Sequence, residues 1–224
     1  MCYCLTGAGN AGFGITVKGG LHATLTRSDN LVESCHVHHN NRVFRTGQPA
    51  LHWAGVGNTF RNNHVHDCPH YAIHGGANQA TCTADAQLSG PTGVLLRPGW
   101  FRNAWVPDDL GICGSSQNRF EGNVVEHAVY ECDDSGAFNT CGQEGTAYIN
   151  RDNAIIGNTF RDVRMRPTND DGSGVLVGGN PIVAAIYFDA AESGWTVENN
   201  TFDGTPPFLL LAVLRHVHSA ALSD

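Results

Sequence analysis

Acidic and polar side chains gather beside four short apolar runs of the sequence. The runs are Ala50–Trp53, Ala72–Gly75, Ala137–Thr140 and Ala185–Asp189. Asp133 and Asp134 precede the third run, and Asp189 ends the fourth. Two neighbouring carboxylates can divide the roles of general acid and of nucleophile or base. Asp134 and Asp189 are therefore the candidate catalytic residues.

The same runs carry polar side chains at matching positions. Because alternate side chains of a strand point to one face, the runs place His52, His74, Asn139 and Tyr187 in one outward row. Such a row supplies the donors and acceptors that a chain of sugar hydroxyls requires. With Asp133 and Glu192 these residues form the candidate substrate-binding set. A single Asp at such a place is more often a turn residue that bonds to the backbone, but two that flank the same strand face on successive coils favour chemistry.

Histidines are concentrated in the first third of the chain, where eight of the twelve lie between residues 36 and 74. His36 and His64 occupy one position of a recurring pattern, and His38 and His66 occupy another. Stacked copies of one structural feature explain this spacing without a metal ion, which needs convergent ligands. The sequence therefore predicts no metal site and no cofactor.

The pattern that positions these residues is a short frame that recurs along the chain. Its first residue is usually Asn, an apolar residue follows two positions on, Asn or Cys follows at five positions, and a second apolar residue at seven. The copies begin at Asn30, Asn58, Asn118, Asn153 and Trp195. Such self-similarity indicates one structural unit stacked on copies of itself.

The frame predicts an all-β fold, a right-handed parallel β-helix. Its apolar residues would stack inside the tube, and the Asn at position five would form a ladder between coils. A leucine-rich repeat would need a denser leucine pattern, and a β-sandwich would not repeat one frame. We expect the β-helix over residues 1–205, interrupted by an excursion at about 79–116 and a loop at 164–181, and followed over 206–224 by a tail or short capping helix.

Composition limits the partners of the chain. Its 224 residues suffice for one sizeable core, charged residues make up 15%, and the formal net charge is −8. With Lys18 as its one lysine, the chain is not expected to bind nucleic acid or an anionic membrane. The apolar stretch 208–214 is too short to span a bilayer. We expect a carbohydrate partner and a monomer.

Cysteines and the N-terminal residues bear on the compartment. The eight cysteines are irregularly spaced, which favours buried free thiols with at most one disulfide, Cys82–Cys113, across the excursion. Residues 1–7 lack a basic start and an apolar run, so no secretory signal is visible. Because glycan-active β-helices are normally secreted, we expect an extracellular or secretory-pathway protein of which this chain is a piece or a mature form.

Seven runs in fixed order resemble a known family. They are 23–26, His36–His38, Val56–Thr59, His66–Ile73, Asp134–Ala137, Arg151–Asn153 and Ala185–Asp189. They look like the right-handed β-helix glycoside hydrolases that include α-L-fucosidases and xylanases acting on plant cell-wall pectin and xylan. The resemblance implies that Asp134 and Asp189 are the two catalytic acids, because that family carries one in an Asp-x-Gly-Ala run and the other in an Ile-Tyr-x-Asp-Asp run.

Two departures from that family fall in the expected site. Ala190 replaces the second Asp of the latter run, and residues 140–143 replace a Gly-Arg pair. They imply altered specificity or lost activity. Two alternatives to hydrolysis therefore stay open: a polysaccharide lyase, for which Arg45 and Arg151 are the candidate bases, and a non-catalytic glycan-binding or structural β-helix.

Overall fold

The structure is a computed structural model. It describes residues 2–3, 6–8, 12–20, 24–76, 115–141, 150–165, 182–189, 194–206, 208–210 and 217–220. Four expectations fall wholly or mostly outside these residues: the Cys82–Cys113 disulfide, the positions of Glu192 and Ala190, the excursion, and the loop at 164–181.

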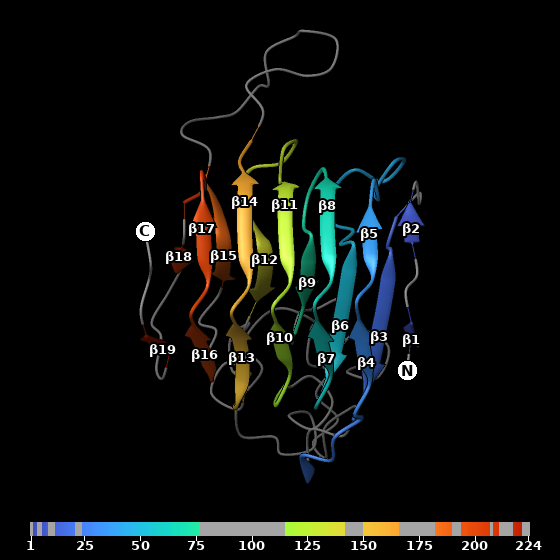
Figure 1. Ribbon diagram of the computed structural model, residues 1–224, viewed down its shortest axis with the longest axis vertical. Coiled ribbons are helices and arrows are strands. Elements are labelled where there is room, and N and C mark those ends of the chain that lie inside the picture. Colours follow the sequence, from blue (N-terminus) through green and yellow to red (C-terminus); the bar gives the residue numbers. More distant parts are fainter. Residues whose placement is uncertain are drawn as a thin grey trace, which may run out of the picture.

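The described strands form three parallel sheets (Figure 1). The first contains β1 (Cys2–Tyr3), β4 (Leu31–Glu33), β7 (Thr59–Arg61), β10 (Arg119–Glu121), β13 (Asn153–Ile156), β16 (Trp195–Glu198) and β19 (Val217–Ala220). The second contains β2 (Thr6–Ala8), β5 (His36–His38), β8 (His64–Cys68), β11 (Val124–Ala128), β14 (Thr159–Val163) and β17 (Thr201–Asp203). The third contains β3 (Ile15–Gly19), β6 (Leu51–Gly55), β9 (Ile73–Gly75), β12 (Ser135–Cys141), β15 (Val183–Asp189) and β18 (Phe208–Leu210).

The chain visits the three sheets in turn, so each coil adds one strand to each sheet. This is the right-handed parallel β-helix that the frame predicts. The first two strands of a coil are the two halves of the frame, and a left-handed residue separates them. Ser34, Asn62, Gly122, Gly157 and Asn199 hold that place, with φ between 54° and 64°. Asn and Gly recur there because they enter this region most readily.

Two asparagine ladders join the coils, one at position five of the frame and one at position one. At position five the amide of Asn63 donates to Asn123, Asn123 to Asn158, and Asn158 to Asn200, over 2.9, 2.8 and 3.0 Å. This is the predicted ladder. A second one, which the sequence interpretation did not include, runs at position one through Asn30, Asn58, Asn118 and Asn153, with amide bonds of 3.1, 2.9 and 3.1 Å.

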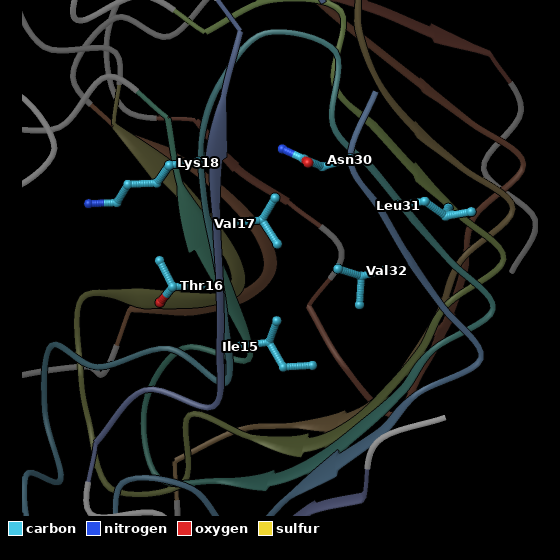
Figure 2. Close-up of a pocket in the computed structure, with 7 residues that line it drawn as sticks. All are labelled: Ile15, Thr16, Val17, Lys18, Asn30, Leu31 and Val32. Atoms are coloured by element: carbon cyan, nitrogen blue, oxygen red, sulfur yellow. The ribbon is translucent and has the colours of Figure 1, made fainter. Parts of the chain in front are cut away.

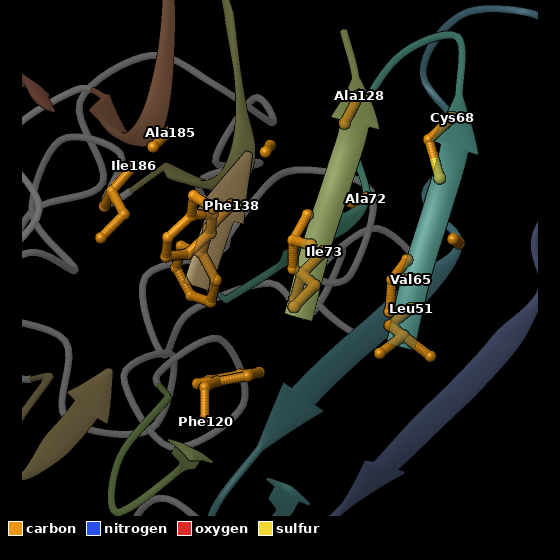
Figure 3. Packing of buried hydrophobic residues seen from close by; sticks show 14 of the residues in the cluster. Leu51, Val65, Cys68, Ala72, Ile73, Phe120, Ala128, Phe138, Ala185 and Ile186 are labelled. Atoms are coloured by element: carbon orange, nitrogen blue, oxygen red, sulfur yellow. The ribbon is translucent and has the colours of Figure 1, made fainter. Parts of the chain in front are cut away.

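The apolar positions of the frame fill the tube (Figure 3). Phe120 lies at the centre of an aromatic cluster, with ring centroids 5.1 Å from Phe60, 5.2 Å from Trp53 and 4.9 Å from Phe138. All four side chains are buried. Cys35, Cys68 and Cys132 are buried free thiols, as the irregular spacing predicted.

The interior of the tube opens into a hollow of about 340 Å³ beside β3 and β4. Ile15, Val17 and Val32 line it, while Thr16 and Lys18 point the other way (Figure 2). The hollow is open to solvent, and its apolar side is formed by Ile15, Val17 and Val32 at the edge of the core.

Two boundaries differ from the sequence prediction. Residues 208–210 and 217–220 are the strands β18 and β19, which pair with β15 and β16, where a tail or a short helix was expected. Ser115 and Ser116 belong to a coil, because Ser116 bridges Val56 and Arg151. No helix of the described segments has the length and apolar character needed to cross a membrane.

Candidate functional site

The four polar residues predicted in one row do lie in one row of the third sheet. His52 of β6 pairs with His74 of β9, His74 pairs with Asn139 of β12, and Asn139 pairs with Tyr187 of β15. Their sequence neighbours Leu51, Ile73, Phe138 and Ile186 point into the core. The row is therefore on the outer face of the sheet, at the predicted register.

Three residues of the row are buried. His52, Asn139 and Tyr187 are 5%, 4% and 1% exposed. Aromatic rings pack on two members: Phe13 lies 5.2 Å from His52, and Tyr71 stacks on His74 at 4.3 Å, measured between ring centroids. Strand periodicity predicts which face a side chain takes, but not what then packs over that face.

Burial keeps the histidines of the row neutral. It lowers the pKa of His52 to about 4 and that of His74 to about 3, with Lys18 adding to the effect at His52 and His52 adding to it at His74. Among the described residues, Nδ1 of His52 has no hydrogen-bond partner. This atom is buried, so its missing hydrogen bond carries a cost in the folded chain.

Asp134 and Asp189 both lie close to Tyr187. The Tyr187 hydroxyl donates to Oδ1 of Asp134. Burial raises the pKa of Tyr187 well above its usual range, and the bond to Asp134 and the charges of Asp134 and Asp189 raise it further. β12 and β15 lie in adjacent coils. Asp134 directly precedes β12, whereas Asp189 ends β15 opposite Cys141, and Tyr187 interacts with both carboxylates. Asp134 is exposed and Asp189 is half-buried.

Asp133 and Asn139 bond to the backbone of the site. Oδ1 of Asp133 accepts from the amides of Asp134 and Ile182, at 2.8 and 2.5 Å, and so joins the starts of β12 and β15. Oδ1 of Asn139 accepts from the amide of Gly136 at 3.3 Å. These contacts hold Asp134 and Tyr187 in place and give Asp133 a positioning task beside its predicted role in substrate binding.

The turn before Asp133 is fastened to two earlier coils. Arg45 donates twice to the carboxylate of Glu131, and the amides of Val129 and Glu131 bond to the carbonyls of Cys68 and Pro69 at 3.0 and 3.1 Å. Arg45 is thereby committed to an ion pair rather than presented as the base of a lyase.

Tyr71 is a site residue that the sequence interpretation missed. Its ring stacks on His74, so it lies within the same cluster. The sequence does contain a hint of this role, because the aromatic pair His70-Tyr71 directly precedes the run that carries His74. An aromatic residue beside a polar row is common in sugar-binding sites, because apolar ring faces stack on sugar rings.

Comparison with known proteins supports the fold. The sequence matches no protein-family model, and no curated protein matches it. A solved structure titled "Glycoside hydrolase" is similar over 96% of this chain, with a TM-score of 0.56 and 14% sequence identity. This chain spans 30% of the length of that structure. At this identity the likeness establishes the shared architecture, and the class of the chain is the parallel β-helix.

Proposed function

We propose that the chain is a carbohydrate-active β-helix domain that hydrolyses glycosidic bonds of cell-wall poly- or oligosaccharides. The observation that carries the proposal is the grouping of Asp134, Tyr187 and Asp189 on two adjacent coils. Paired carboxylates on either side of a bound sugar are the common requirement of glycoside hydrolysis. The shared architecture with a structure titled as a glycoside hydrolase supports the same class.

In this mechanism Asp134 and Asp189 act as the acid and the nucleophile or base. One carboxylic acid protonates the leaving oxygen, while the other carboxylate attacks the sugar carbon or activates water. The Tyr187 hydroxyl orients the Asp134 carboxylate by its hydrogen bond. The row of His52, His74 and Asn139 extends from this pair along the coils and would bind sugar hydroxyls, with Glu192 as a further predicted contact. A secreted or extracellular monomer fits this substrate.

The test compares Asp134→Asn and Asp189→Asn with the native full chain. We expect each variant to lower the rate of reducing-end release from pectin, xylan or fucosylated oligosaccharides by about 10²–10⁴-fold, the usual contribution of a positioned acid or base. Asp203→Asn is the matched control, since Asp203 is an exposed residue of β17 in the second sheet. Wild-type rates in both site variants would rule out the assignment.

A second candidate is a non-catalytic glycan-binding β-helix. Ala190 favours it, because it stands where the resembled family carries the second Asp of the Ile-Tyr-x-Asp-Asp run. Glycan binding by calorimetry without turnover by the native full chain would establish this second function. Products that absorb in the ultraviolet would instead identify a lyase.

A further inference from the structure

Four histidines form a tight cluster on the outer face of the second sheet, away from the candidate catalytic pair. His36 and His38 of β5 pair in register with His64 and His66 of β8. The closest ring centroids in this cluster are 4.4 to 4.9 Å apart. β5 and β8 are neighbours in Figure 1, and both are fixed by the coil stacking. The cluster is therefore held by strands and not by loops.

Ring nitrogen atoms of this cluster point toward one another. Stacking of the rings alone would not bring the nitrogens together. One nitrogen from each of His36, His64 and His66 lies within 4.8 Å of the other two. Nε2 of His36 is 2.6 Å from Nε2 of His66. The three residues are partly exposed, so an ion in solution can reach them.

Two carboxylates orient the rings. Nδ1 of His66 bonds to Oδ2 of Asp67 at 2.7 Å, which leaves Nε2 to face His36. A ring nitrogen of His64, Nε2, bonds to Oε1 of Glu126 at 2.7 Å. A carboxylate on the nitrogen that does not bind the ion is the usual second partner of a metal-binding histidine, because it fixes the tautomer and the ring direction. His66 would therefore bind through Nε2 and His64 through Nδ1, the nitrogens that Asp67 and Glu126 leave.

We propose that His36, His64 and His66 bind a divalent first-row transition-metal ion of the zinc class. Imidazole nitrogen suits such ions, and three protein ligands leave a fourth position for water. With Zn–N bonds of about 2.0–2.1 Å, tetrahedral ligands lie about 3.3 Å apart, so binding requires a small rotation that separates the His36 and His66 nitrogens.

His66 is common to a second convergent group. His38, His39 and His66 also bring one nitrogen each within 4.8 Å of one another. His39 follows β5 in an exposed, left-handed position with φ of 54°. The three members of the first group all lie in strands and carry both orienting carboxylates, so we assign the ion to them. Because both groups would use the same nitrogen of His66, only one of the two groups can hold an ion at a time.

The proposal is tested by titrating Zn²⁺ into the untagged, metal-stripped full chain in a calorimeter. We expect saturable binding of one ion. His66→Asn is expected to weaken binding more than 100-fold, and Asp67→Asn by about 10–100-fold, the usual effect of losing an orienting carboxylate. Glu33→Gln is the matched control, because it removes a carboxylate of the first sheet that pairs with Arg61 and should leave the affinity unchanged.

Substitution of Co²⁺ gives a second readout, since its visible absorption reports tetrahedral nitrogen ligation. His36→Asn and His64→Asn should abolish that absorption, while His39→Asn should keep it. Circular dichroism of each variant verifies that the sheets are intact. The assignment is overturned if the wild type shows no saturable binding, if His66→Asn binds like the wild type, or if His39→Asn loses as much affinity as His64→Asn.

Discussion

At the residue scale, the protonation of buried histidines affects the stability of the folded chain. His70 is 8% exposed, and its Nδ1 accepts a hydrogen bond from the amide of Gly47 at 2.7 Å. Burial lowers the pKa of His70 to about 4. A proton on Nδ1 would bury a charge and break the bond to Gly47, so the folded chain keeps this ring neutral.

The consequence is a dependence of stability on pH. Between about pH 6.5 and 4 the unfolded state binds a proton at residue 70 that the folded state does not, so acidification through this window lowers the free energy of unfolding. Above pH 6.5 both states are neutral and the effect is absent. The same sign holds for His52 and His74, whose pKa values are lowered to about 4 and about 3.

His70→Asn tests this at one site, because the Asn side chain can still accept from Gly47 but does not titrate. We expect the variant to lose stability less steeply on acidification, by up to about 1.4 kcal/mol per pH unit within the window. Urea unfolding at pH 7, 6, 5 and 4 measures the slope for the wild type and the variant. Parallel slopes would show that His70 does not contribute.

At the element scale, the Asn ladders make each coil depend on the next. Oδ1 of Asn123 accepts from the amide and the side chain of Asn63, and its own side chain donates to Asn158 and to the carbonyl of Phe60. All of these groups are buried, where an unpaired polar atom is costly. The bends between the strands of a coil are therefore fixed by side chains as well as by backbone conformation.

Asn123→Ala is expected to lower the free energy of unfolding by about 3–5 kcal/mol, because it leaves several buried donors and acceptors without partners at about 1–3 kcal/mol each. Asn30→Ala removes the end of the other ladder, where one amide bond to Asn58 is lost from a partly exposed side chain. That control should cost about 1 kcal/mol. Chemical denaturation compares the two, and equal losses would contradict the ladder's role.

The elements were largely predictable from the sequence, and the surroundings of the site were not. The frame places Asn63, Asn123 and Asn158 at one bend of each coil, because spacing along a strand is a local property. The same local rule aligned His74 with Asn139 and His36 with His64. It could not show that Tyr71 covers His74, or that nitrogens of His36 and His66 converge, since both depend on side-chain directions set by neighbouring coils.

At the scale of the whole molecule, a solenoid concentrates its stability where coils have neighbours on both sides. Phe120 occupies that position: it is 1% exposed and contacts rings from β6, β7, β12 and β16. Ile15 lies beside the hollow at β3, is only partly buried and has fewer groups around it. Both side chains point into the tube, but truncating Phe120 would create a cavity in the core, whereas truncating Ile15 would enlarge an existing hollow.

Phe120→Ala would leave a cavity inside a close-packed core, which usually costs about 3–5 kcal/mol. Ile15→Ala enlarges an existing hollow that solvent already enters, so we expect a loss of about 1 kcal/mol, below the range for a fully buried site. Guanidinium unfolding of the full chain gives both values. Comparable losses would mean that the coil at β3 is as tightly packed as the central ones. A larger loss for Phe120 would instead show that the core beneath β12, which Asp134 directly precedes, is packed more tightly than the coil at β3, as a fixed carboxylate geometry requires.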